Sequence, residues 1–330
     1  MKIPPDFIIT TEILKLLSQI ESLRLLFKSL PIKTELKNKI ERVSLLKSSL
    51  YSARIEGNPL TFEQVKDPYL SKNNKKIEVF NILYAIKYLD SYVQSGSFLD
   101  LSLILKLHSI VMKDLSASSG FFRTEPGAIF NQAGVAVYVA PDPLKIKELI
   151  EQLLTYSNST SDFPVLQALI THLCFEKIHP YEDGNGRIGR LLIWAILKSK
   201  GYDFPAFIPI EEYIDNNRNS YYFHLDQGMK ETEEYLKFML EAFEIEAEKI
   251  KDEILNDTNQ DTDIILPPRQ EEIFAIIKDH LNVSFDFISR RFYKVPARTL
   301  RYDLKKLAEK GQIVKVGKTR GSFYRVKKMY

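Results

Sequence analysis

A long apolar helix pattern that runs directly into a glycine-rich turn constrains the fold of this chain most strongly. Over residues 165–178 the apolar positions Leu166, Leu169, Ile170 and Leu173 share one helix face, and Gln167, Thr171 and Glu176 lie off it. The pattern ends at His179-Pro180, and a second apolar helix pattern covers residues 188–197. A dinucleotide-binding fold would place a strand before such a turn. Here the turn joins two helix patterns, which predicts a helical fold instead.

Most of the remaining patterns are also helical. They cover residues 10–60, 77–92, 101–115, 144–156, 210–228 and 233–254. We expect Asn58-Pro59 to end a helix, because proline disfavours helical geometry in the residue before it. Residues 127–139 differ: three valines alternate there and 131–134 supplies turn residues, which predicts a β-hairpin. The predicted fold class is therefore mainly α, with one small hairpin in this part of the chain.

The charge distribution separates the C-terminal part from the rest of the chain. Residues 264–330 contain 16 Lys and Arg against 6 Asp and Glu, a net charge of +10, whereas the remainder carries −7. This asymmetry indicates either a polyanionic partner or a basic, well-solvated surface. We predict an N-terminal helical region over residues 1–100, a helical core over 101–255, a polar linker over 256–263 and a separate domain over 264–330.

Composition excludes several other classes of protein. The single cysteine, Cys174, excludes an internal disulfide framework and a zinc site built from several cysteines. The first residues lack the basic, apolar and small-residue succession of a signal peptide, and no run approaches the roughly 20 apolar residues of a membrane-spanning helix. We therefore expect a cytoplasmic protein without membrane association.

The turn between the two helix patterns combines residue types that bind phosphate. Residues 179–190 read His-Pro-Tyr-Glu-Asp-Gly-Asn-Gly-Arg-Ile-Gly-Arg. Backbone N–H groups of residues 184–187 would point out of a helix N-terminus, where the helix dipole favours an anion. Arg187 and Arg190 share a helix face and suit phosphate oxygens. Asp183 is a candidate Mg²⁺ ligand, and His179, with an ordinary pKa of about 6.5, is a candidate general base.

Two other interpretations of this turn are weaker. Gly184, Gly186 and Gly189 satisfy the dinucleotide-binding pattern G-x-G-x-x-G, but the segment before them is helical. A turn with a purely structural role would not need His, Asp, Asn and two Arg together. Elsewhere, His172 is interpreted as structural, and no role is given to His108, His224 or His280.

The turn resembles the signature of the Fic family, H-P-[FY]-x-[DE]-G-N-G-R-x-x-R, at every position, with Tyr181 in a place more often held by phenylalanine. The resemblance covers residues 47–241, mostly as helix pattern. It implies that His179 accepts the proton of a Ser, Thr or Tyr hydroxyl, whose oxygen attacks the α-phosphorus of ATP and expels pyrophosphate. It also implies that Asp183 holds Mg²⁺ and that the nucleotide-binding residues include Gly184, Asn185, Gly186, Arg187 and Arg190.

Three further segments resemble parts of the same family. Residues 52–57 fit the inhibitory helix motif [ST]-x-x-x-E-[GN], which implies that Ser52 and Glu56 approach Arg190; an exposed glutamate before a helix stop is the alternative. The hairpin residues Ile129, Phe130 and Tyr138 look like the flap that grips a target segment by strand pairing. Residues 217–222 resemble a segment that frames the nucleotide base. For its residues Tyr221 and Tyr222 a core role is an equal alternative, and no expected asparagine is apparent downstream, so base selectivity stays open.

The C-terminal domain has the pattern of a winged helix-turn-helix. Helix patterns over residues 271–280, 285–292 and 298–310 precede two strand patterns that bracket residues 317–321. Residues 296–307 resemble the recognition helix of bacterial winged-helix regulators, with Arg298, Arg301 and Lys305 facing outward toward a major groove. Lys318 and Arg320 at the wing tip would reach phosphates. Many winged helices bind proteins instead, so the choice between DNA and protein stays open.

The sequence thus leaves two classes of function. The first is a protein adenylyltransferase that uses ATP and Mg²⁺ on a target protein with an accessible hydroxyl, itself included, and that Glu56 inhibits through Arg190. The second is a DNA-binding regulator whose Fic domain senses nucleotide; a Fic enzyme that transfers another phosphate-linked group is a further alternative. A pure sensor needs no general base, so His179 together with Asp183 favours the enzyme. A homodimer is compatible with either class.

Overall fold

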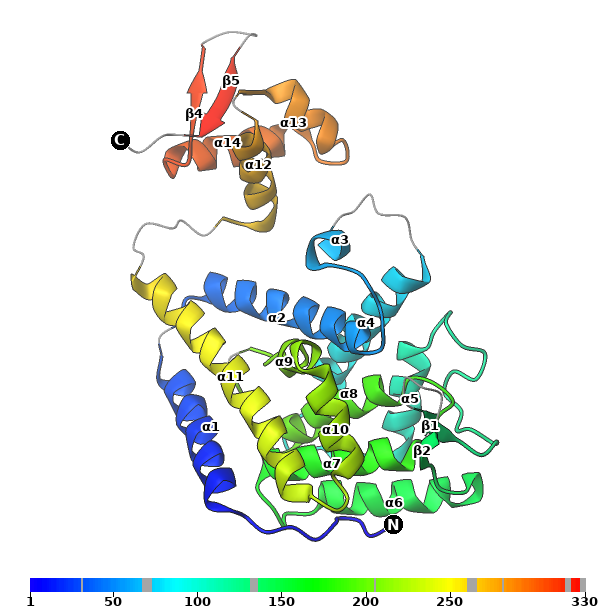
Figure 1. The fold of residues 1–330 in the computed structure, drawn as a ribbon. Coiled ribbons are helices and arrows are strands. Elements are labelled where there is room, and N and C mark those ends of the chain that lie inside the picture. Colours follow the sequence, from blue (N-terminus) through cyan, green and yellow to red (C-terminus); the bar gives the residue numbers. More distant parts are fainter. Residues whose placement is uncertain are drawn as a thin grey trace. The chain divides into compact units, whose positions relative to one another are not determined.

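The computed structural model describes residues 1–30, 32–66, 73–130, 136–204, 206–259, 266–280, 282–317 and 322–326. The chain divides into two compact units, Met1–Asn256 and Asp257–Tyr330 (Figure 1). The prediction of a mainly helical fold is confirmed. None of the described helices combines the length and the apolarity that crossing a bilayer requires.

The first unit begins with helices of which several have a side-chain cap at their start. They are α1 (Thr11–Ser29), α2 (Thr34–Ile55), α3 (Phe62–Lys66), α4 (Asn74–Tyr92) and α5 (Leu101–Val111). Thr10, Asn73 and Asp100 precede α1, α4 and α5, and each side chain accepts a backbone N–H of the first turn. Such caps satisfy donors that have no partner inside the helix.

A hairpin and a second set of helices complete this unit. Strands β1 (Ala128–Phe130) and β2 (Ala136–Val139) precede the short 3-10 helix η1 (Pro143–Lys145). The following helices are α6 (Ile146–Asn158), α7 (Pro164–Ile178), α8 (Asn185–Ser199), α9 (Ile210–Asn216), α10 (Arg218–Gln227) and α11 (Thr232–Asn259). The predicted hairpin is thereby confirmed, with residues 131–135 outside the described part; β1 and β2 are antiparallel.

Helix α7 forms the centre of the unit. The expectation of one buried face is wrong, because all residues from Val165 to Ile178 are buried. Gln167, Thr171 and Glu176, expected off the apolar face, are only 1%, 2% and 6% exposed. Since α6 and α8 both pack on α7, a helix in this position has no solvent side and its polar side chains are buried with the apolar ones.

Several predicted boundaries are corrected by local backbone geometry. Helix α2 ends at Ile55, before it reaches Asn58-Pro59. Gly57, two residues after the helix end, has φ 96°. Helix α5 stops short of residue 115, and Asp114 beyond it has φ 61°. The single helix expected over residues 210–228 breaks at Asn217, whose side chain donates to Tyr213 O. Helix α11 runs to Asn259, so the first residues of the expected linker are helical.

The second unit contains α12 (Pro268–Asp279), β3 (Val283–Ser284), α13 (Phe285–Arg291), α14 (Ala297–Glu309), β4 (Ile313–Val316) and β5 (Phe323–Val326). Its antiparallel sheet has the strand order β3-β5-β4. Leu300, Leu304 and Leu307 of α14 enter the core as predicted. Arg298, Arg301 and Lys305 lie exposed, whereas Lys318 and Arg320 fall outside the described residues.

Candidate active site

His179 marks the end of α7 and the start of the loop. Its N–H donates to Phe175 O at 3.0 Å, and its backbone has φ 49° and ψ 60°. This left-handed conformation costs a non-glycine residue on the order of 1–3 kcal/mol and turns the chain sharply away from α7. Ring Nδ1 lies 3.4 Å from Glu176 O, so Nδ1–H is the donor and Nε2 keeps its lone pair. Burial lowers the pKa of His179, which leaves the ring neutral at neutral pH.

The start of α8 faces the other side of the same loop. Gly184 precedes the helix with φ 87°, a conformation that glycine adopts without strain. The helical hydrogen bonds of α8 begin with the N–H of Ile188, which donates to Gly184 O at 3.0 Å. The N–H groups of Asn185, Gly186 and Arg187 therefore have no acceptor within the helix and form an anion-binding N-terminus.

The side chain of Asn185 holds the loop together. Its Oδ1 accepts the Tyr181 N–H at 2.9 Å and its Nδ2 donates to Tyr181 O at 2.8 Å. Both polar atoms of the amide are thus used within the loop. The backbone N–H of Asn185 at the start of α8 faces no acceptor within the helix, and the predicted part of this residue in binding nucleotide stays a prediction.

His108 of α5, which sequence reasoning left without a role, supports the same loop. Its ring stacks on Tyr181 at a centroid distance of 3.6 Å, and its Nδ1 accepts the Gly120 N–H at 2.8 Å. Nε2 therefore carries the proton and donates to Asp183 O at 3.0 Å. Burial lowers the pKa of His108, in keeping with this neutral tautomer. No sequence spacing links residues 108 and 183, so only the fold reveals this contact.

Arg187 is held by two carboxylates. Its Nη1 donates to Glu78 Oε1 of α4 at 2.7 Å, and its Nη2 donates to Asp183 Oδ1 at 2.6 Å. Glu78 also accepts from Asn58 Nδ2 at 2.9 Å. Since the Arg187 side chain is only 5% exposed, its charge is neutralised inside the protein. Glu78 was not singled out from the sequence and Asn58 only as a helix stop, because a glutamate 109 residues away from its arginine gives no local signal.

Arg190 is one of the most deeply buried of the predicted site residues. Its Nη2 donates to Glu56 Oε1 at 2.9 Å and to Ser52 O at 2.9 Å, and its Nε donates to Ser52 Oγ at 3.0 Å. The side chain is 1% exposed, against 30% for Glu56. A Cβ atom on Gly186 would lie 2.3 Å from Glu56 Oε1, so this glycine leaves room for the carboxylate. The structure thus brings Ser52, Glu56 and Arg190 together, as the sequence predicted.

Behind Arg190 lies a cluster of buried polar groups between α7 and α8. His172 Nε2 contacts the Tyr221 hydroxyl at 2.9 Å, and burial lowers the pKa of His172 to about 3. Burial likewise raises the pKa of Glu176 to about 8, so its carboxyl is mainly protonated at neutral pH. A Cβ atom on Gly189 would come within 2.5 Å of Glu176 Oε1, which explains the glycine at this position. His172 therefore has the structural role that its position predicted.

Asp183 suits a magnesium ion bound together with phosphates. Its carboxylate is 67% exposed, and its hydrogen bonds within the described part of the chain, from Gly184 N–H and Arg187, both use Oδ1. Mg²⁺ commonly takes one or two protein carboxylates and fills its other positions with water and substrate phosphate. The described residues contain no group of three His, Cys, Asp or Glu side chains that could hold a metal without such a substrate.

Comparison with known proteins identifies the domain that contains this loop. The sequence model of the Fic/DOC family matches residues 98–197, which include the hairpin, His179 and the loop. This chain contains a Fic/DOC domain.

Curated relatives and solved structures agree with this assignment. The chain is 30% identical over 186 residues to the protein adenylyltransferase Fic of Drosophila mojavensis and 31% to that of Drosophila virilis. These matches cover 53% of this chain but only 35% and 36% of those proteins. The fold resembles a Fic family protein from Desulfovibrio desulfuricans, with a TM-score of 0.69, 22% identity and 98% of both chains covered. Fic-1 from C. elegans gives a TM-score of 0.61, with 22% identity and coverage of 74% of this chain and 73% of that one.

Tyr221 and Tyr222, predicted to lie beside the nucleotide base, differ in their exposure to solvent. Tyr221 is 1% exposed and its hydroxyl is used by His172, so a direct contact with a base is not available to it here. Tyr222 is 46% exposed, and its hydroxyl donates to Ile55 O at the end of α2. The core alternative therefore holds for Tyr221, because its neighbours on α7 enclose it.

The hairpin of the Fic domain is tied to α7 through Tyr138. Ile129 lies opposite Tyr138 in the β1–β2 register. The Tyr138 hydroxyl donates to Lys177 O at 2.8 Å, two residues before His179. The side chains of Ile129 and Phe130 lie outside the described part of the structure, so their predicted contacts with a target segment stay predictions.

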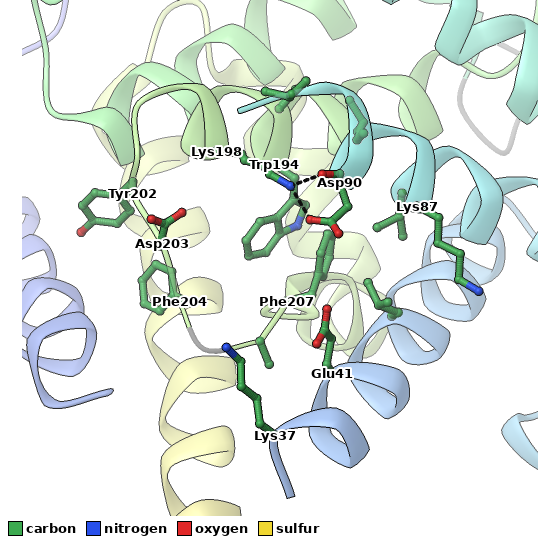
Figure 2. Close-up of a pocket in the computed structure, with 16 residues that line it drawn as sticks. Lys37, Glu41, Lys87, Asp90, Trp194, Lys198, Tyr202, Asp203, Phe204 and Phe207 are labelled. Atoms are coloured by element: carbon green, nitrogen blue, oxygen red, sulfur yellow. Dashed lines mark hydrogen bonds and ion pairs between the residues drawn. The ribbon is translucent and has the colours of Figure 1, made fainter. Parts of the chain in front are cut away.

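A cavity of about 230 Å³ lies on another side of α8 (Figure 2). Trp194, Phe204 and Phe207 line it between α2, α4 and α8, and Lys198 pairs with Asp90 at its wall. None of its lining residues belongs to the 179–190 loop. The catalytic loop of the Fic domain is thus distinct from this cavity.

Proposed function

We propose that this protein is an adenylyltransferase that moves AMP from ATP onto a hydroxyl side chain of a protein. The observation that carries the proposal is the joint placement of a neutral His179 and the free N–H groups at the start of α8 on one loop. The Drosophila relatives, each a protein adenylyltransferase Fic, support this choice of reaction.

The proposed step has a defined route for each bond. The target oxygen forms a bond to the α-phosphorus of ATP, the bond from that phosphorus to the bridging oxygen breaks, and pyrophosphate leaves. Nε2 of His179 accepts the hydroxyl proton because Nδ1 already carries the proton donated to Glu176 O. The N–H groups of Gly186 and Arg187 stabilise the α-phosphate. Mg²⁺ held by Asp183 would offset the phosphate charge.

We further propose that the described arrangement is an inhibited one. Both signature arginines are already paired with carboxylates, Arg187 with Glu78 and Asp183, and Arg190 with Glu56. A γ-phosphate that needs Arg190 would have to displace Glu56 from a guanidinium that is only 1% exposed, where charged hydrogen bonds are strong. Inhibition by α2 follows from this competition.

The experiment that tests the proposed activity uses the Glu56→Gly variant. The purified variant is incubated with α-labelled ATP and Mg²⁺ in a lysate of its own cells, and labelled proteins are separated. We expect label on the variant itself and on one or a few target proteins. If label appears on neither, the proposed transfer fails, and the nucleotide-sensing regulator becomes the better account.

The pH dependence of transfer provides a separate prediction. Because burial lowers the pKa of His179, its neutral, proton-accepting form persists below the ordinary histidine value of about 6.5. The transfer rate of Glu56→Gly at saturating ATP should therefore stay flat from about pH 7 to 8 and fall only below about pH 6.5. ATP affinity measured over the same range serves as the control. A rate that halves above pH 7 while ATP affinity is constant would contradict this assignment of the base.

For the second unit we propose a winged helix-turn-helix that binds DNA. Its succession α12-β3-α13-α14-β4-β5 supports the fold, and the exposed Arg298, Arg301 and Lys305 on α14 support a phosphate-rich partner. Helix α14 is braced from inside, because buried Asp303 accepts from Gln270 of α12 at 3.1 Å. The outward cations thus lie on a helix that is bonded to α12 on its inner side.

We predict that the full chain binds duplex DNA with steep salt dependence. Each cation that contacts a phosphate contributes about 0.9 to the slope of log affinity against log salt. Replacing Arg298, Arg301 and Lys305 together by glutamine should flatten that slope, whereas the control Lys15→Gln on α1 should not. Absence of any electrophoretic shift by the full chain at low salt would indicate a protein partner instead.

A further inference from the structure

Arg123 lies between His179 and both ends of the hairpin. Its guanidinium is buried, with the residue 4% exposed, and donates to three backbone oxygens. Nε donates to His179 O at 2.8 Å, Nη1 to Glu125 O at 2.9 Å and Nη2 to Pro141 O at 2.6 Å. Glu125 precedes β1 and Pro141 follows β2. The Arg123 side chain therefore contacts both His179, the proposed general base, and the two ends of the hairpin.

Contacts around the guanidinium fix its position. The Arg123 N–H donates to Pro180 O at 2.9 Å, and the hairpin closes below it where Ala140 N–H donates to Gly127 O at 2.9 Å. A Cβ atom on Gly127 would lie 3.2 Å from Arg123 Nε, so the hairpin backbone packs directly on the guanidinium. Only the planar fork of arginine can reach three acceptors in these directions; a lysine ammonium cannot.

We propose that Arg123 is the positioning residue that holds the hairpin in register with His179, and thereby favours a protein hydroxyl over water as the acceptor of AMP. The inference rests on the proposed adenylyl transfer. A water molecule needs only the base and the bound ATP. A hydroxyl carried by a target segment on the hairpin needs the base and the hairpin at one fixed separation.

The two sides of this contact depend on Arg123 unequally. Without the guanidinium, His179 keeps the bond of its N–H to Phe175 O and the bond of its ring to Glu176 O, and the next residue, Pro180, keeps its bond from the backbone N–H of residue 123. Among the described contacts, the hairpin keeps its tie to α7 through the Tyr138 hydroxyl. Loss of the fork should therefore displace the hairpin more than the base, and misplacement by about 1 Å can cost about 10²-fold in rate.

The test measures two products in the Glu56→Gly background. Labelled AMP on the protein reports transfer to a hydroxyl, and free AMP released from ATP reports transfer to water. We expect Arg123→Lys to lower the ratio of protein-bound to free AMP by about 10-fold or more, as expected for a misplaced acceptor. Arg24→Lys, a matched change on α1 where Arg24 pairs with Glu21, should leave the ratio unchanged.

The remaining outcomes separate this inference from the proposed function. An unchanged ratio of protein-bound to free AMP, including one in which both products fall equally, would overturn the role of Arg123. Absence of both products from the Glu56→Gly parent would instead overturn the proposed transfer. If Arg123→Lys does not fold, Tyr138→Phe decides: removing the second tie of the hairpin should lower the same ratio in the same direction, and an unchanged ratio would overturn the inference.

Discussion

Replacement of His179 by alanine is expected to abolish AMP transfer while ATP binding is retained. The imidazole supplies the lone pair at Nε2, and removal of a general base costs about 10² to 10⁴ in rate. In the proposed site, ATP is held by other groups, namely the N–H groups at the start of α8 and the two arginines, and the described hydrogen bonds of these arginines do not include the His179 ring. The change is made in the Glu56→Gly background, where the parent rate is measurable.

Labelled-AMP incorporation and the Kd for ATP are measured on the same preparations. His224→Ala on α10 is the matched control, because it removes a histidine that lies outside the loop. It should change neither the incorporation of AMP nor the Kd for ATP. Near-normal incorporation by His179→Ala would remove the base from the mechanism. Loss of ATP affinity together with the rate would show that the imidazole serves binding rather than proton transfer.

Glu56→Gly is expected to raise the transfer rate by about 10²-fold over the unsubstituted protein. In the described arrangement Glu56 lies on Arg190 at 2.9 Å, and the Arg190 side chain is 1% exposed. If the γ-phosphate cannot reach Arg190, the α-phosphorus is out of line with the hydroxyl held by His179, and such misalignment costs about 10² in rate. Removing the carboxylate frees both the charge and the space beside Gly186.

Related variants locate the effect on this ion pair. Glu56→Gln keeps the shape and loses the charge, so it should release the enzyme partly. Ser52→Ala removes one hydrogen bond to Arg190 but keeps the ion pair, so its gain should be smaller. The Glu56→Gly/Arg190→Ala variant should lose the gain. Equal rates of unsubstituted protein and Glu56→Gly would show that the pair is only structural.

Local residue chemistry explains why much of the site is predictable from sequence. His179, Asp183, the glycines and the two arginines lie within twelve residues, so one helix end, one turn and one helix start determine their relative positions. Glu56 was predicted to meet Arg190 only through a motif resemblance, because the spacing of distant residues carries no geometric information. The helical class followed from periodicity that packing requires.

The contacts of His108 and Arg123 that support the loop could not be predicted from the sequence, for a different reason. His108 and Arg123 act on backbone oxygens of residues 183, 179, 125 and 141, and a carbonyl group leaves no mark in a sequence. Tyr221 shows another limit: the sequence leaves a nucleotide-binding role and a core role equally open, and the contact with His172 and the burial of Tyr221 favour the core role. Tertiary packing decides such positions.

The most direct test of the account compares two labels on ATP. Purified Glu56→Gly protein is incubated with Mg²⁺ and either α-labelled or γ-labelled ATP, and label on the protein is counted after removal of free nucleotide. Adenylyl transfer predicts label from the α-position alone, lost again in the Glu56→Gly/His179→Ala variant. Label from the γ-position, or none from either, would contradict the account.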